Sequence, residues 1–138
     1  MGGGDIQSAV RRKELLGVSA GTSVALSLVI PAYNEAERLP ATLDSVAGHL
    51  SGWSASWEVI VADDGSDDRT GDLARQAGTR DSHFRYLELK HRGKAAAVAA
   101  GVAASRGEVI IFTDADLSTP ISYIDAVHAL IPEQADVV

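Results

Sequence analysis

Four short apolar runs alternate with segments of helical periodicity along this chain of 138 residues. The runs cover residues 25–30, 57–63, 84–89 and 108–114. Runs of this length, bounded by proline, glycine or polar residues, are typical of buried β-strands. Strands that alternate with helices of ten or more residues favour right-handed crossovers and a mostly parallel sheet. We therefore expect an α/β fold in which helices flank such a sheet.

The segments between these runs carry their own helix signals. Pro40 suits the first position of a helix over 40–50. A second helix, over 68–78, would be closed by Gly78. An alanine-rich helix follows over 93–105, and Thr119 with Pro120 opens a last one over 121–131. Residues 136–138 would begin a fifth strand.

Length and composition bound the class of protein. The chain suits one domain, and 46% hydrophobic residues are enough for a packed core. A net charge of -7 argues against nucleic-acid binding, and the absence of cysteine excludes disulfides and thiolate zinc sites. We expect a mobile tail over 1–23 and a folded part over 24–138. The apolar stretch 15–30 also resembles part of a signal peptide, but it is rich in glycine and serine.

Polar motifs follow three of the predicted strands. They read PAYNE at 31–35, ADDGSDD at 62–68 and TDADLS at 113–118. In a parallel sheet these ends open onto one edge, where ligands bind. The carboxylates gathered there would be Glu35, Asp63, Asp64, Asp114 and Asp116. Like charges this close are tolerated when they share a cation, and oxygen ligands suit magnesium or manganese. The edge therefore predicts a divalent metal with a polyanionic ligand.

Two further features point to the same edge, each with a plainer alternative. Asp114 and Asp116 are two residues apart, so in an extended segment both can face one ion. They could instead cap a helix or face solvent. The run KHRGK at 90–94 opens the alanine-rich helix, where basic groups are well placed for phosphate. It could equally be a solvated turn, and Tyr33 could stack on a base or fill a gap under its loop.

Taken together, the motifs resemble those of the family-two nucleotide-sugar glycosyltransferases. The segments SLVIPAYNEAERLP, VIVADDGSDDRT, HRGKAAAVAAG and GEVIIFTDADLSTP occur in that order. The resemblance is strongest to the polyprenyl- and dolichyl-phosphate sugar synthases, whose members carry DADLSTP-like segments. It implies a Rossmann-like sheet of the glycosyltransferase A type, with 24–138 as its nucleotide-sugar-binding half.

The resemblance also implies roles for individual residues. Asp64 would hydrogen-bond the base, whereas Asp63 would support the loop. Asp114 and Asp116 would be the catalytic aspartates of a DxD motif that holds magnesium or manganese. Asp116 would coordinate the metal directly, and Asp114 would lie nearer the ribose or a metal-bound water. The nucleotide would be bound by Pro31, Ala32, Tyr33, Glu35, Asp64, Arg92, Gly93, Lys94 and Asp114.

The implied reaction moves a sugar, with inversion, from a nucleoside diphosphate to a lipid-linked phosphate of the polyprenyl or dolichyl type. The sequence leaves open whether the base is uracil or guanine, which sugar is carried and which oligomer forms. The acceptor side and any general base would lie beyond Val138, so we expect little or no turnover from these residues alone. The resemblance places the protein in the cytoplasm, at the cytoplasmic face of a membrane.

Two other functions fit parts of the sequence. The domain could bind a nucleotide without transferring anything. The DxD segment also approaches the motif of haloacid-dehalogenase-like phosphatases, in which the first aspartate is a nucleophile. Ser118 stands where that motif has threonine or valine, and no lysine or arginine follows Asp116. The phosphatase is therefore the weaker alternative.

Overall fold

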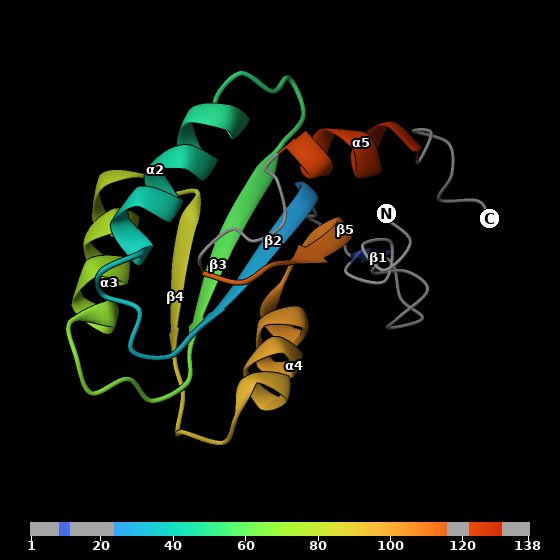
Figure 1. Cartoon of the computed structure of the whole chain (residues 1–138). Coiled ribbons are helices and arrows are strands. Elements are labelled where there is room, and N and C mark those ends of the chain that lie inside the picture. The colour runs from blue at the N-terminus through green and yellow to red at the C-terminus, as the bar shows by residue number, and fades with distance from the viewer. Residues whose placement is uncertain (1–8, 12–23, 116–121, 131–138) are drawn as a thin grey trace.

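The computed structural model describes residues 9–11, 24–115 and 122–130. These residues form a five-stranded sheet in the order β1–β5–β2–β3–β4, with helices on both faces (Figure 1). The strands are Ala9–Arg11 (β1), Val24–Ala32 (β2), Trp57–Asp63 (β3), Phe84–Glu88 (β4) and Gly107–Phe112 (β5). The helices are Leu39–Leu50 (α2), Thr70–Arg80 (α3), Lys94–Ala104 (α4) and Ser122–Leu130 (α5).

Strand β2 lies at the centre of the sheet and pairs in parallel with both β3 and β5. Leu28 stands opposite Val59 on one side and opposite Ile111 on the other. Strand β4 extends the parallel part beyond β3. A helix bridges each parallel step, as parallel strands require. The predicted α/β fold with a mostly parallel sheet is thus confirmed.

Strand β1 differs from the prediction, which placed residues 1–23 in a mobile tail. Ala9–Arg11 pairs antiparallel with β5, so that Val10 lies opposite Ile110. Pairing with this edge gives the backbone N–H and C=O groups of β1 partners within the sheet. The correction concerns these three residues, because the rest of 1–23 lies outside the described residues. The boundary near residue 24 remains a prediction.

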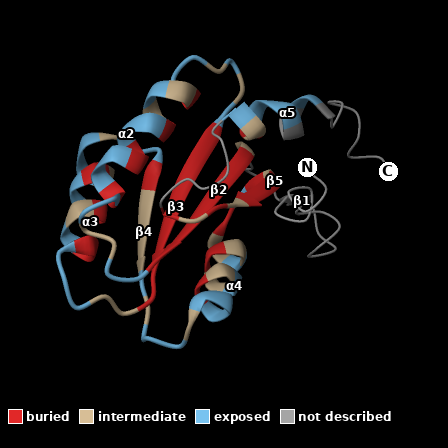
Figure 2. Ribbon diagram, in the orientation of Figure 1, coloured by how far each residue is buried: buried red, intermediate tan, exposed pale blue. Residues whose placement is uncertain are grey.

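The main core lies between the sheet and helices α2, α3 and α5. Leu28, Val59 and Ile111 pack there against apolar residues of these helices. Helix α4 covers the opposite face, with Ala97 and Gly101 buried. Because both faces are covered, the central strands are buried along nearly their whole length (Figure 2).

The helix boundaries differ from the predicted ones by one or two residues, and two of the differences concern sequence signals. Helix α2 begins at Leu39, one residue before Pro40. Helix α3 continues to Arg80, so the prediction that Gly78 closes it is wrong. The reason for glycine there is packing, since a Cβ on Gly78 would lie 3.0 Å from the carbonyl oxygen of Phe84.

The carboxyl-terminal predictions are met in part. The strand predicted over 108–114 is observed as β5 and ends at Phe112, so that Asp114 lies in the loop after it. The helix predicted over 121–131 is observed as α5. Thr119, Pro120 and the strand predicted over 136–138 lie outside the described residues.

A buried charge ties the strands together near their amino ends. Glu58 in β3 is 1% exposed. Its carboxylate accepts hydrogen bonds from the Ser27 hydroxyl at 2.6 Å and the Arg106 backbone N–H at 2.6 Å. The guanidinium groups of Arg85 and Arg106 donate to it at 2.8 and 3.0 Å. Burial alone raises the pKa of Glu58, but these hydrogen bonds outweigh it and hold the pKa below its ordinary value.

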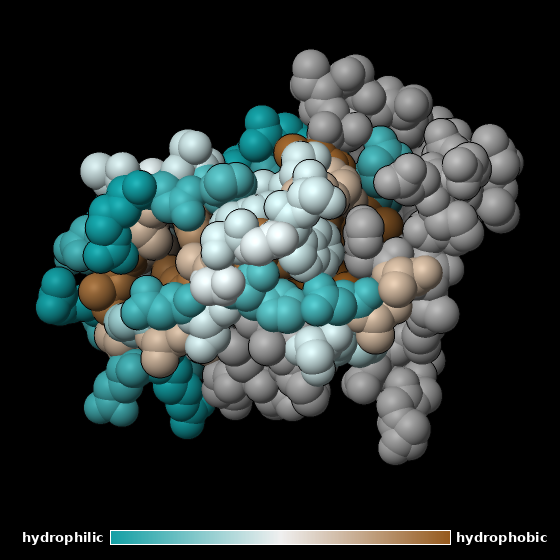
Figure 3. Space-filling view, turned by 90° about the horizontal axis from the view of Figure 1, so that it is seen from above, coloured by the Kyte–Doolittle hydropathy of each residue, from teal (hydrophilic) through white to brown (hydrophobic). Residues whose placement is uncertain are grey.

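Figure 3 views the molecule from above Figure 1, from the side of α5 and the turn that follows α2. Hydrophilic and intermediate side chains dominate this face, and hydrophobic ones show between them in small areas. The turn leads into the amino end of β3, so this face is opposite the edge where the carboxyl ends of the parallel strands lie.

Candidate functional site

A pocket of about 410 Å³ lies at the carboxyl ends of β2 and β5, beside the amino end of α4. It is lined by Pro31, Ala32, Tyr33, Glu35, Asp64, His91, Gly93, Lys94, Ala97, Asp114 and Ala115. The fold thus brings together the residues predicted for a nucleotide pocket, with one exception. Arg92 lines a neighbouring pocket of about 340 Å³ instead. Asp116 lies outside the described residues.

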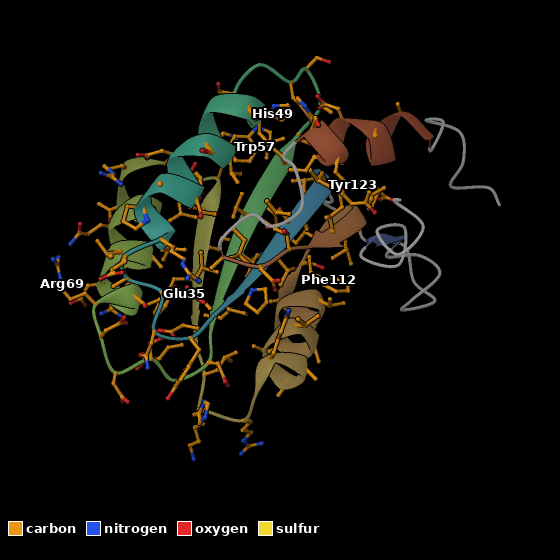
Figure 4. All side chains as sticks on the ribbon, viewed as in Figure 1. Glu35, His49, Trp57, Arg69, Phe112 and Tyr123 are labelled. Carbon is orange, nitrogen blue, oxygen red and sulfur yellow. The ribbon has the colours of Figure 1, made fainter. Side chains whose placement is uncertain are left out.

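The loop after β2 is held by the loop after β3. The Asn34 N–H donates to the Ser66 hydroxyl at 2.8 Å, and the Glu35 N–H donates to the Thr70 hydroxyl at 2.8 Å. In return the Asn34 side-chain oxygen accepts the Asp67 N–H at 2.8 Å. Figure 4 shows Glu35 on this loop, between the end of β2 and the start of α2. The two loops therefore form one unit at the sheet edge.

Asp64 holds the segment that precedes α4. Its carboxylate accepts the backbone N–H groups of Arg92 at 2.8 Å and of Gly93 at 3.0 Å, and His91 Nδ1 lies 2.9 Å away. These contacts engage both carboxylate oxygens, and the residue is 4% exposed. The Arg92 N–H is the largest cause that lowers the pKa of Asp64. The segment can approach this closely because residue 65 is a glycine. A Cβ there would lie 2.7 Å from the backbone nitrogen of His91.

Asp63 is not among the residues that line the pocket. One carboxylate oxygen accepts the Ser66 N–H at 3.0 Å and the other accepts the Tyr86 hydroxyl at 2.8 Å. Burial, followed by this bond to Asp63, raises the pKa of Tyr86 to about 12. Asp63 is therefore positioned to brace the loop, the role that the family resemblance implied.

One wall of the pocket is aromatic. The rings of Tyr33 and His91 are stacked, with centroids 4.4 Å apart and planes 23° from parallel. Tyr33 is 41% exposed, the most exposed large hydrophobic side chain among the described residues. The sequence did not single out His91, which stands within the basic run at 90–94. Only its position over Tyr33 and beside Asp64 identifies it as part of the site.

The lining of the pocket also carries an ion pair between Lys94 and Asp114. The Lys94 ammonium group contacts Oδ1 of Asp114. Lys94 is the first residue of α4, and it follows Gly93, whose φ of 103° lies in the left-handed region. The Thr42 hydroxyl of α2 donates to the Ala115 carbonyl and so fixes the loop that carries Asp114. The pocket thus places a basic group and a carboxylate in direct contact.

The donor chemistry of the pocket fits a divalent cation shared with a phosphate ligand. Among the described residues, no group of three or more histidine, cysteine, aspartate or glutamate side chains could hold an ion alone. Magnesium-type sites commonly use one or two carboxylates and complete their coordination with water and substrate phosphates. Asp114 supplies one such carboxylate, which here pairs with the ammonium group of Lys94.

The comparison with known families identifies the class of protein. Residues 27–138 match the profile of the family described as glycosyl transferase family 2. The match covers most of the chain, which therefore belongs to that family.

The names of similar curated proteins identify them as transferases that act on lipid phosphates. Over 128 residues the chain is 40% identical to a dolichyl-phosphate beta-glucosyltransferase of Drosophila melanogaster, covering 83% of this chain and 39% of the relative. Over 115 residues it is 37% identical to an undecaprenyl-phosphate 4-deoxy-4-formamido-L-arabinose transferase of Salmonella choleraesuis, covering 82% and 35%. The chain thus spans little more than a third of the length of these relatives.

Solved structures share the fold. A mannosyltransferase from Pyrobaculum calidifontis in complex with GDP-Man and Mn²⁺ is 25% identical, with a TM-score of 0.62 over 88% of this chain and 38% of that one. Glucosyl-3-phosphoglycerate synthase from Mycobacterium tuberculosis, in complex with Mn²⁺, UDP and glucosyl-3-phosphoglycerate, is 27% identical, with a TM-score of 0.57 over 74% and 37%. These likenesses confirm the predicted glycosyltransferase A-type architecture.

None of the helices in the described ranges is long and apolar enough to span a bilayer.

Proposed function

We propose that this chain is the nucleotide-sugar-binding part of a glycosyltransferase that transfers a sugar to a polyprenyl or dolichyl phosphate. The observation that carries the proposal is the pocket itself. The aromatic wall, the segment before α4 and the Asp114–Lys94 ion pair meet there at one edge of the sheet. The similarity to lipid-phosphate glycosyltransferases supports the acceptor class.

The walls of the pocket suggest how a nucleoside diphosphate would lie in it. The base would pack against Tyr33 at the aromatic wall, since exposed rings favour stacking with bases. The diphosphate would lie toward the amino end of α4, where backbone N–H groups and Lys94 favour anions. Asp64 would act mainly through the segment it holds, because both of its oxygens already accept hydrogen bonds from the protein.

The leaving diphosphate would lie near Asp114 and Asp116, which we propose as ligands of magnesium or manganese. A bound divalent ion would neutralise the charge that develops on the leaving group. The acceptor phosphate oxygen is already anionic, so it needs less help from a general base than a hydroxyl would. Direct displacement by that oxygen would invert the anomeric centre. The site would face the cytoplasm, at a membrane that holds the lipid acceptor.

Calorimetric titration of the chain with UDP and with GDP, each with and without Mn²⁺, tests the donor site. We expect one nucleotide to bind in a Mn²⁺-dependent manner, and Asp116→Ala to remove that dependence. A chain that is folded by circular dichroism but binds neither nucleotide would contradict the proposal for these residues.

Transfer itself is tested by incubating the protein with UDP-glucose or GDP-mannose and a short polyprenyl phosphate. A glycosylated lipid with inverted configuration, detected by NMR, supports the enzyme. Nucleotide binding without transfer, in a protein that includes the remaining length of its relatives, would favour a non-catalytic binding module instead.

A further inference from the structure

We propose that Lys94 and a divalent cation compete for the carboxylate of Asp114, and that Lys94 thereby couples metal binding to nucleotide binding. In this arrangement Lys94 is a positioning residue with two partners. It pairs with Asp114 when no metal is bound, and it turns to the diphosphate when metal takes its place on Asp114. The inference rests on the proposed function, since it takes the diphosphate as the second partner.

The first support is the contact itself. The Lys94 ammonium group touches Oδ1 of Asp114, and both residues line the 410 Å³ pocket. Their side chains are 64% and 46% exposed, so neither is locked in the core. An exposed ion pair of this kind is worth at most about 1 kcal/mol. A doubly charged ion can therefore displace the ammonium group without disturbing the fold.

The second support is the contrast between a fixed backbone and a movable side chain. Gly93, directly before Lys94, is held by two hydrogen bonds from its N–H to the Asp64 carboxylate, at 3.0 and 3.1 Å. The Ala97 N–H donates to the Gly93 carbonyl at 3.1 Å and so continues the first turn of α4. Beyond this anchored backbone, Lys94 has a flexible four-carbon stem. Its ammonium group can change partners while the helix stays in place.

The third support is the charge of the other lining residues. The Asp64 carboxylate accepts backbone N–H groups. The Glu35 carboxylate forms an ion pair with Arg38, with Oε1 and Nη1 3.6 Å apart. When metal occupies Asp114, the displaced ammonium group is left beside a second positive charge. A diphosphate removes this repulsion, because its oxygens can bind the metal ion and pair with the Lys94 ammonium group. Metal and nucleotide should therefore bind with positive cooperativity, and part of that coupling should pass through Lys94.

Lys94→Met tests the competition directly, because methionine keeps the length of the side chain and removes its charge. We expect Mn²⁺ alone to bind the variant about three- to fivefold more tightly than the unaltered chain. In the presence of Mn²⁺, we expect whichever of UDP and GDP binds the unaltered chain to bind the variant more weakly, because the variant lacks the ammonium group that turns to the diphosphate. Bound and free Mn²⁺ are distinguished by electron paramagnetic resonance, and nucleotide binding by calorimetry.

Lys90→Met is the matched control. It removes the same charge from the same basic run, but Lys90 lines the neighbouring pocket rather than this one. We expect it to change the affinity for Mn²⁺ alone by less than about twofold, as an exposed charge outside this pocket should. Lys94→Gln serves as a second variant if the methionine variant fails to fold, with circular dichroism as the check.

Equal Mn²⁺ affinity in the unaltered chain and the Lys94 variants would overturn the inference, and so would undetectable binding to all of them. An equal gain in Mn²⁺ affinity in the Lys90 variant would also overturn it. The gain would then follow from the loss of any positive charge in the basic run. These outcomes are independent of nucleotide. Failure of UDP and GDP to bind with Mn²⁺ would count against the proposed function, and the comparison with Mn²⁺ alone would still decide the competition at Asp114.

Discussion

At the scale of single residues, the site depends on side chains that hold backbone as much as on side chains that face the pocket. Asp64 was expected to hydrogen-bond the base, yet its oxygens accept hydrogen bonds from the segment before α4. His91 lies next to Asp64 and stacks on Tyr33, so it connects this support to the aromatic wall. A substitution at His91 should therefore affect both the contact with Asp64 and the aromatic wall.

Two substitutions at His91 separate these contributions. His91→Phe keeps a ring over Tyr33 but loses the contact with Asp64, whereas His91→Ala loses both. We expect nucleotide affinity to fall about two- to threefold in the first and about tenfold in the second, since an aromatic pair contributes roughly 0.5–1.5 kcal/mol. Calorimetry measures the affinities. Unchanged affinity in His91→Ala would show that the aromatic wall does not need this ring.

The sequence could predict which residues line the pocket, because strand ends of a parallel sheet share one edge. The structure brings three of the predicted residues, Tyr33, Lys94 and Asp114, into the lining of one pocket. The sequence could not predict what Asp64 bonds to or which way Arg92 faces. Those details depend on how the segment 91–93 crosses the loop after β3, and no local pattern encodes that approach.

At the scale of elements, alternating apolar runs were sufficient to locate the four parallel strands, because both faces of the sheet are covered. Strand β1 escaped prediction, since three residues carry too little periodicity to indicate a strand. The end of α3 was misplaced for a different reason. Gly78 is a common helix-closing residue, but here it makes room for the backbone after the helix.

Helix α4 carries Lys94 and packs closely on β2, and it allows a test of a glycine that makes room for close packing. A Cβ on Gly101 would lie 2.4 Å from Cγ1 of Val29. Gly101→Ala should therefore lower the free energy of unfolding by about 1–3 kcal/mol, as overpacking does. Gly48→Ala in α2 is the matched control, since nothing lies within 4 Å of its Cβ position. It should raise stability by up to about 1 kcal/mol. Urea unfolding of both variants checks the pair, and equal effects would refute the close-packing argument.

At the scale of the whole molecule, the fold separates the pocket from the charged cluster around Glu58. The cluster joins β2, β3, β4 and the turn before β5 at the other end of the sheet. Arg85 also donates to the carbonyl of Ala104 at 2.9 Å, which ties in the carboxyl end of α4. Changes here should act on stability rather than on the chemistry of the pocket.

Glu58→Gln should lower the free energy of unfolding at pH 7 by about 2–3 kcal/mol. The expected loss is smaller than for a fully buried pair, because Arg106 is half exposed. The folded-state pKa of Glu58 lies below its ordinary value of 4.5, so the carboxylate stabilises the fold above that pH. Its contribution is lost as pH falls through the folded-state pKa.

The difference between the unaltered chain and Glu58→Gln should therefore shrink in acid. Urea unfolding at pH 7 and at several values below 4.5 measures this. Glu88→Gln, at an exposed position of β4, should change stability by less than about 0.5 kcal/mol at any of these values. A difference that stays constant with pH would exclude the proposed role of the Glu58 charge.

The hydrogen bonds between the loops at the sheet edge have a thermodynamic consequence. The backbone N–H groups of Asn34 and Gly93 are bound by side chains of the loop after β3, and that of Glu35 is bound by Thr70 at the start of α3. Folding therefore meets most of the conformational entropy cost of ordering these loops, and binding need not meet it again. Such a preorganised pocket can change its ligand preference through Tyr33 and His91 while its frame stays the same.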